Sequence, residues 1–121
     1  MSNKNGLILI AHGSKNNEAN KYVADLTAQL IATCHDKYDF INFAFLQFAN
    51  PTIEDAVSVH IQKEIKNIYI FPFFLGPGNH VLTDIPNSMN QLKIKHPTIH
   101  FSILPAFGCA NNIATWIKSL V

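Results

Sequence analysis

Short apolar runs alternate with segments of helical periodicity along the whole chain, and this alternation limits the possible folds more than any other feature. The apolar runs predict strands at residues 7–11, 40–46, 67–71 and 99–104. Apolar residues at helical spacing predict helices over about residues 19–30, 53–61, 83–95 and 111–120. The last of these helices shows four apolar residues on one side, at Ile113, Trp116, Ile117 and Leu120.

The character of the strands indicates how they are arranged. Nearly continuous apolar strands are typical of a parallel sheet covered by helices on both faces. Because crossovers between parallel strands are right-handed, few topologies remain. We therefore predict an α/β fold: a single doubly wound four-stranded parallel sheet with the flavodoxin-like order 2-1-3-4. A length of 121 residues suits a single domain, residues 1–121.

Local signals predict where the second helix begins. Asn50 or Thr52 is the expected N-cap, with Pro51 in the first turn. Glu54 and Asp55 follow, where the helix dipole favours acidic side chains.

Charge and composition exclude several functions. The formal net charge is +1 and all nine basic residues are lysines, so nothing favours nucleic-acid binding, and a bidentate guanidinium clamp is excluded. No stretch reaches the roughly 18–20 apolar residues of a membrane span, and the polar residues 1–5 do not form a signal peptide. We therefore expect a cytoplasmic protein without membrane contact. Cys34 and Cys109 lack metal-site spacing and are expected to be buried thiols.

Two histidines are predicted to meet at one edge of the sheet. Ligands of an open parallel sheet bind outside the carboxyl ends of the strands, here between the first and third strands. His12 follows the first strand, and His80 lies in the loop after the third. Neutral imidazole binds divalent metals and accepts protons near neutral pH, so the pair suits metal handling or proton abstraction. The other histidines show no such convergence and are expected to be structural: His35, His60, His96 and His100.

Glycine-containing loops follow both of these strands. Gly13 and Ser14 predict a tight turn into a helix whose first N–H groups favour anions, and a plain helix cap at Ser14 fits the same residues. Gly76 and Gly78 allow the backbone to approach a ligand closely, and they equally suit a simple turn. Neither loop matches a P-loop or a dinucleotide fingerprint, so no nucleotide is expected.

Phenylalanines cluster at the ends of the second and third predicted strands, in residues 43–48 and 71–74. Most are expected in the core. Those beyond the strand ends, Phe74 among them, suit an apolar cleft for a flat ligand. The apolar fraction of 48% and the nine phenylalanines also suggest buried surface beyond the core of one monomer, such as a dimer interface or an apolar ligand cleft.

The segments LILIAHGS, FAFLQFANPTIEDAV and IYIFPFFLGPGNHVLTDIP resemble, in order and spacing, the small class II tetrapyrrole chelatases. These are the short CbiX-type family and its longer sirohydrochlorin ferrochelatase relatives. AHGS together with a second histidine in G-x-H-V and a following D-I-P carries the resemblance, which covers nearly the whole chain. It implies a chelatase-like fold and ATP-independent insertion of Co(II), Fe(II) or Ni(II) into sirohydrochlorin or a related reduced tetrapyrrole.

The resemblance also implies roles for individual residues. His12 and His80 would bind the metal substrate and help to remove the pyrrole protons, and a short chain would assemble as a homodimer. Without arginine, the carboxylates of the tetrapyrrole need donors such as Lys15, Lys21, Thr83 or backbone N–H groups. The residues expected to contact the tetrapyrrole are Ser14, Gln47, Phe74 and Gly78.

One residue departs from the family pattern. Members commonly carry an acidic residue, in the segment F-L-E, where this chain has Gln47. A carboxamide forms hydrogen bonds but neither takes up a proton at neutral pH nor lends charge to a cation. Two functions therefore stay open: a chelatase, and a non-catalytic protein that binds metal or tetrapyrrole. A histidine phosphatase is disfavoured, because its Arg-His-Gly signature and surrounding arginines are missing.

Overall fold

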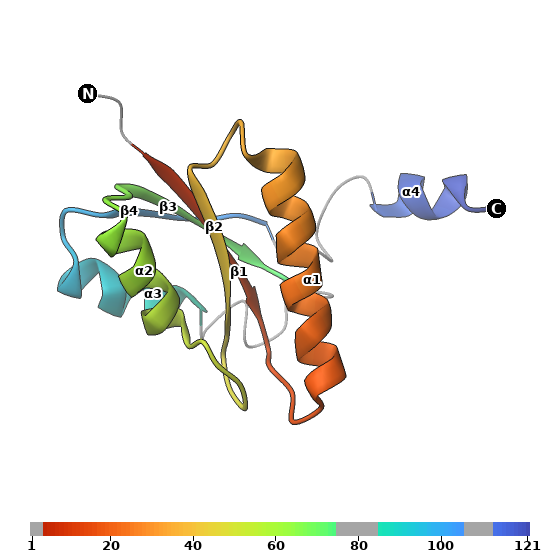
Figure 1. Ribbon diagram of the computed structural model, residues 1–121, viewed down its shortest axis with the longest axis horizontal. Coiled ribbons are helices and arrows are strands. Elements are labelled where there is room, and N and C mark those ends of the chain that lie inside the picture. Colours follow the sequence, from red (N-terminus) through yellow and green to blue (C-terminus); the bar gives the residue numbers. More distant parts are fainter. Residues whose placement is uncertain (1–3, 75–84, 106–112) are drawn as a thin grey trace.

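Each apolar run forms a strand and each periodic segment a helix in the computed structural model, which describes residues 4–74, 85–105 and 113–121. The elements, shown in Figure 1, are β1 (Asn5–Ala11), α1 (Asn17–Cys34), β2 (Phe40–Phe45), α2 (Ile53–Gln62), β3 (Asn67–Pro72), α3 (Ile85–Lys95), β4 (His100–Ile103) and α4 (Ile113–Ser119).

The four strands form one parallel sheet in the order β2-β1-β3-β4, which confirms the predicted fold class and strand order. β1 is central: Ile10 lies opposite Ala44 of β2 and Pro72 of β3. The chain leaves β1 toward β2 and later returns to its other side as β3. The switch point, where such sheets bind ligands, therefore lies at the carboxyl ends of β1 and β3.

One face of the sheet carries a closed core under α2 and α3 (Figure 1). Ile8 and Ile10 of β1 point to this face, because successive side chains of a strand alternate between its two sides. Three residues of α3 are buried here: Ile85, Met89 and Leu92.

The other face is covered by α1 and holds a small buried cluster of Leu9, Ala11, Val23 and Phe45. Tyr22 of α1 is 59% exposed. A cavity of about 450 Å³ remains between α1 and the strands. We call it the α1 groove and define it by six of its residues: Tyr22, Leu26 and Leu30 of α1, and Phe71, Phe73 and Leu104.

Cys34 also lines the α1 groove and is half-buried rather than fully buried as predicted, while Cys109 lies outside the described residues. The thiol is accessible because the groove beside it is open. In the described part of the chain, none of the helices has the length and apolar character of a membrane span.

Thr52 is the N-cap of α2 and forms a capping box with Asp55. The Thr52 hydroxyl accepts a hydrogen bond from the Asp55 N–H, and the Asp55 carboxylate accepts one from the Thr52 N–H. Glu54 and Asp55 lie in the first turn as predicted. The prediction that Pro51 lies in the first turn is wrong, because the capping oxygen comes from Thr52 and the helix begins after it.

α4 takes no part in covering the sheet. None of its residues is buried, and Figure 1 shows it beyond α1, away from the strands. Trp116 is 58% exposed and Ile117 is 53% exposed. Helical periodicity thus predicted the apolar side of this helix, but periodicity alone does not determine what covers such a side.

Candidate functional site

His12 lies at the carboxyl edge of the sheet, directly after β1, as the sequence predicts. Its side chain is exposed, and its ring centroid lies 4.4 Å from that of Phe74, which follows β3 and is buried. The two rings are inclined by 49°. The switch point therefore brings together an exposed imidazole that follows one strand and a buried aromatic ring that follows the other.

Backbone hydrogen bonds fix the segment that carries His12. The Leu46 N–H donates to the Ala11 carbonyl at 3.0 Å, and the Gln47 N–H donates to the His12 carbonyl at 3.0 Å. The chain after β2 thus continues the pairing past the end of β1. As a result, Gln47, at the position where the family commonly has an acid, lies next to His12 along this edge.

A glycine is required at position 13 by the close approach of this segment to Gln47. Its φ is 88°, in the left-handed region that side chains disfavour, and a Cβ atom there would lie 1.8 Å from the Gln47 carbonyl oxygen. Only glycine allows the two segments to approach this closely. The glycine after His12 therefore serves the geometry of the site.

Asn20 holds the turn that follows. Its side-chain oxygen accepts a hydrogen bond from the Ser14 N–H at 2.9 Å, and its amide donates to the Ser14 carbonyl at 2.7 Å. Asn16, not Ser14, is the N-cap of α1, so a cap at Ser14 is the wrong interpretation. The Ser14 hydroxyl instead accepts from the Asn16 N–H. Sequence reasoning missed Asn20, because an asparagine in a first helical turn has no distinctive pattern.

An exposed ring and a cation lie on the neighbouring loop. Phe48 is 59% exposed with a φ of 67°, and the Lys15 ammonium lies 5.3 Å from the centroid of its ring. Such an arrangement offers an apolar surface and a positive charge to one ligand. Gln47, Phe48 and Lys15 are all exposed.

His80 and Gly78 lie outside the described residues, so their predicted places at the site stay predictions. The residues that are described contain no group of three or more His, Cys, Asp or Glu side chains able to hold a metal. Of the two predicted ligands, His12 is therefore the one that the structure describes.

His60 of α2 is a buried histidine that sequence reasoning treated as unremarkable. Nε2 donates a hydrogen bond to Asn42 Oδ1 at 2.8 Å in the tautomer that fits this pair, while Nδ1 has no partner among the described residues. Burial lowers the pKa of this imidazole to about 4. Gly6 makes room for the ring, since a Cβ there would lie 2.2 Å from His60 Nδ1. Gly6 is the second residue of β1, so this histidine lies near the edge opposite His12 and has a structural role.

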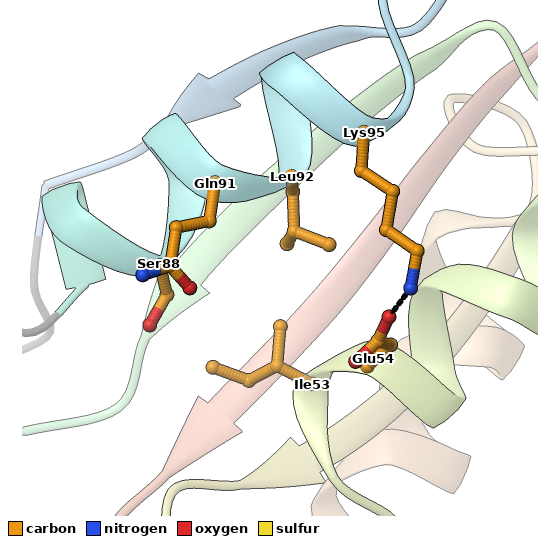
Figure 2. A pocket seen from close by; sticks show the side chains of 6 residues that line it. All are labelled: Ile53, Glu54, Ser88, Gln91, Leu92 and Lys95. Atoms are coloured by element: carbon orange, nitrogen blue, oxygen red, sulfur yellow. Dashed lines mark hydrogen bonds and ion pairs between the residues drawn. The ribbon is translucent and has the colours of Figure 1, made fainter.

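A second cavity, of about 350 Å³, lies between α2 and α3 (Figure 2). Ile53 and Leu92 form its apolar side, and Glu54 and Lys95 close one end with an ion pair. None of its residues was predicted to bind a ligand, and it has no metal-ligating imidazole. We therefore assign it to the packing of the two helices.

The strand order and the residues at the carboxyl edge of the sheet define an open parallel α/β domain with a histidine at its switch point. The CbiX family model matches residues 6–121, and the chain belongs to the CbiX family.

Two curated relatives and one solved structure agree with this assignment. The chain is 32% identical over 106 residues to the chloroplastic sirohydrochlorin ferrochelatase of Arabidopsis thaliana, covering 88% of this chain and 46% of that protein. It is 25% identical over 116 residues to the sirohydrochlorin cobaltochelatase of Sulfurisphaera tokodaii, covering 96% and 90%. The sirohydrochlorin chelatase SirB from Bacillus subtilis subspecies spizizenii, solved in complex with cobalt, superposes with a TM-score of 0.84 at 21% identity, covering 96% of this chain and 49% of SirB.

The chain thus spans about half the length of the Arabidopsis and Bacillus proteins and most of the Sulfurisphaera one. The likeness to SirB shows the shared fold.

Proposed function

We propose that the protein inserts a divalent metal ion, Co(II), Fe(II) or Ni(II), into sirohydrochlorin or a related reduced tetrapyrrole without ATP. The observation that carries this proposal is the exposed His12 beside Phe74 at the ligand edge of a CbiX-family domain. The names of the relatives support it, since they are called sirohydrochlorin chelatases for cobalt or iron.

In this proposal His12 and His80 bind the metal ion and accept the protons that it displaces. Insertion releases two protons from the pyrrole N–H groups as the metal binds the ring nitrogens, and water leaves the metal. A neutral imidazole supports both events, because the same nitrogen lone pair binds a metal or takes a proton. The role of His80 in this proposal rests on the family resemblance.

The tetrapyrrole lies flat against the aromatic side chains at this edge. Phe48 supplies exposed apolar surface, the buried Phe74 packs behind the His12 ring, and Lys15 supplies a positive charge for a peripheral carboxylate. Ser14, Gln47 and Gly78 are proposed to contact the macrocycle or its carboxylates. We further propose a homodimer that presents two such edges to one substrate, since the chain spans about half of its longer relatives.

Gln47 favours a second candidate, a carrier that binds metal or tetrapyrrole without insertion. Its backbone bonds to the His12 carbonyl, so a residue at this position lies beside the metal site. An amide there supplies neither a proton acceptor nor a negative charge. The carrier binds the substrates tightly but does not accelerate insertion.

Anaerobic insertion of Co(II) into sirohydrochlorin, followed by the absorbance of the macrocycle, tests the proposal. The protein is expected to accelerate insertion, His12→Ala and His80→Ala to lower the rate at least tenfold, and Gln47→Glu to raise it. His100→Ala is the matched control, because His100 is exposed at the start of β4, on the opposite edge. Binding of both substrates without acceleration would establish the carrier, and unchanged rates in both histidine variants would overturn the assigned roles.

A further inference from the structure

Phe48 is a bulky apolar residue whose backbone conformation and exposure are both unfavourable. Its φ is 67°, in the left-handed region that residues with a side chain disfavour, and its ring is 59% exposed. The next residue, Ala49, has far less apolar surface to bury, yet it packs against the buried cluster of the α1 face. Burial alone would favour the opposite arrangement, with the ring inside and the alanine outside.

A second left-handed residue in the described part of the chain, Glu64, has a φ of 63° and an ordinary reason for it. Glu64 directly follows Lys63, the C-cap of α2, and helices commonly end with a left-handed residue at this position. Phe48 ends no helix, because it lies between β2 and α2. The end of a helix therefore does not explain its conformation.

Backbone hydrogen bonds on both sides hold the loop that carries Phe48. Before the ring, the Gln47 N–H donates to the His12 carbonyl at 3.0 Å. After it, the Pro51 carbonyl accepts from the Phe45 N–H at 2.9 Å. The surrounding structure thus imposes the conformation of Phe48 and keeps its ring at the carboxyl edge, near His12.

The ammonium group of Lys15 lies against this ring, 5.3 Å from its centroid. Lys15 is exposed and forms no ion pair with any residue that the structure describes. A carboxylate that reaches the edge of the ring can therefore bind this ammonium without displacing an acidic side chain of the described residues. Ring and charge together form one exposed unit beside His12.

We propose that Phe48 and Lys15 determine which tetrapyrroles the protein accepts: the ring stacks on the face of the macrocycle, and the ammonium pairs with a carboxylate on its rim. This inference rests on the proposed function and names its substrate class, macrocycles with carboxylates on every pyrrole ring, such as sirohydrochlorin. The strain and exposure of Phe48 hold the stacking surface ready before the substrate arrives.

The two groups discriminate between macrocycles in different ways. Every tetrapyrrole offers a flat face to Phe48, so stacking alone selects little. A macrocycle with carboxylates around its whole rim reaches Lys15 in any orientation. A porphyrin whose carboxylates lie on two neighbouring rings reaches it in only some orientations. Lys15 therefore selects for carboxylates around the rim, and Phe48 contributes to the affinity for both kinds of macrocycle.

Phe48→Gly tests the ring, because it removes the side chain and suits the left-handed backbone. The dissociation constant for metal-free sirohydrochlorin, measured anaerobically by absorbance, is expected to rise about fivefold. The midpoint of urea unfolding is expected to stay the same or rise. Glu64→Gly, which relieves a left-handed residue away from the site, is the matched control and is expected to leave the dissociation constant unchanged.

Phe48→Tyr keeps an aromatic ring and is expected to bind sirohydrochlorin as tightly as the wild-type protein. An unchanged dissociation constant in Phe48→Gly would overturn the proposal, because the ring would then serve the fold alone. A loss of affinity in Phe48→Tyr as large as in Phe48→Gly would also overturn it, because stacking would then not be the cause.

Lys15→Met tests the charge. Its affinity for sirohydrochlorin is expected to fall about fivefold at low salt and to depend less on salt, because an ion pair that salt screens is removed. Its affinity for a dicarboxylate porphyrin is expected to fall by a smaller factor. Lys66→Met, which removes a charge just before β3 at the opposite edge, is the matched control. A salt dependence as steep as that of the wild-type protein would overturn the role of Lys15.

These measurements separate this inference from the proposed function. If the wild-type protein binds sirohydrochlorin and accelerates insertion while Phe48→Gly and Lys15→Met bind equally tightly, the selection by these two residues is wrong and the chelatase stands. If the wild-type protein does not bind sirohydrochlorin, the proposed function fails and this inference fails with it.

Discussion

The face of the sheet under α2 and α3 is a closed core, whereas the face under α1 is partly open, although the same strands build both. Ile8, Ile10 and Ile70 are fully buried on the closed face. On the α1 face, Phe71 and Phe73 are only half-buried and line the α1 groove. Strand composition makes both faces apolar, and the placement of the helices determines which of them is covered. An apolar strand sequence therefore predicts that the strand is buried, but it does not predict which element covers it.

Two consecutive residues of β3 test this difference between the closed and the open face. Their substitution has the largest expected effect on the free energy of unfolding. Ile70→Ala is expected to lower the free energy of unfolding by about 3–4 kcal/mol, because it leaves a cavity in the closed core. Phe71→Ala is expected to cost about 1–2 kcal/mol in the monomer, because part of its ring is already exposed to water. Urea unfolding followed by circular dichroism measures both values.

Protein concentration provides the control for this pair. Both costs are measured at the same low protein concentration, so that any association of the chain affects the two variants alike. Equal costs for the two variants in dilute monomer would contradict the distinction between a closed and an open face.

The closed face also contains the one buried titratable side chain that the structure describes with a lowered pKa, His60. Folded protein keeps this imidazole neutral down to about pH 4, while the unfolded chain takes up a proton below its ordinary pKa of 6.5. The contribution of His60 to stability is therefore fully present above pH 6.5 and is lost as the pH falls to 4. The difference between the two pKa values corresponds to about 3 kcal/mol.

Urea unfolding between pH 4 and 7 measures this loss. His60→Leu is expected to flatten the profile, whereas the exposed His100→Gln is expected to keep the slope. A wild-type slope retained in His60→Leu would assign the pH dependence to other groups.

The strand order and the position of His12 could be predicted from sequence because they depend on patterns that extend along the chain. Apolar runs, helical spacing and the handedness of crossovers together allow few topologies, and the carboxyl edge then follows. The predicted second ligand, His80, follows from the same rule but lies outside the described residues. His12 itself is where the rule predicts it, against Phe74.

Features that depend on a single contact in space could not be predicted. His60 and Gly6 lie 54 positions apart, and only packing shows that the missing Cβ of one makes room for the ring of the other. Asn20 forms two hydrogen bonds with Ser14 that no spacing rule anticipates. The N-cap of α1 is Asn16, whose side chain accepts from the Glu18 N–H, while the Ser14 hydroxyl accepts from the Asn16 N–H before the helix begins. Sequence patterns determine which helices and strands form, while side-chain geometry determines how each helix is capped and how its neighbours pack.

A smaller effect is expected at the start of α1, where the α1 face meets the candidate site. Asn20→Ala removes both hydrogen bonds to Ser14 and is expected to lower the free energy of unfolding by about 1–2 kcal/mol. Because the Ser14 turn follows His12 directly, the rate of metal insertion is expected to fall by a larger factor than in Asn17→Ala, an exposed amide at the first position of α1. An unchanged insertion rate in Asn20→Ala would show that the turn does not position His12.

The smallest effect is expected on the closed face, at the ion pair between Glu54 and Lys95 beside the cavity in Figure 2. Both side chains are more than half exposed, so solvent screens their attraction and removal of the pair is expected to cost less than about 0.5 kcal/mol. Lys95→Met and Glu54→Gln, alone and together in a double-mutant cycle, measure the coupling free energy. The closed face owes its stability to buried isoleucines if this coupling is small and disappears in high salt. A coupling comparable to the cost of Ile70→Ala would instead make the polar contact between α2 and α3 the stronger link.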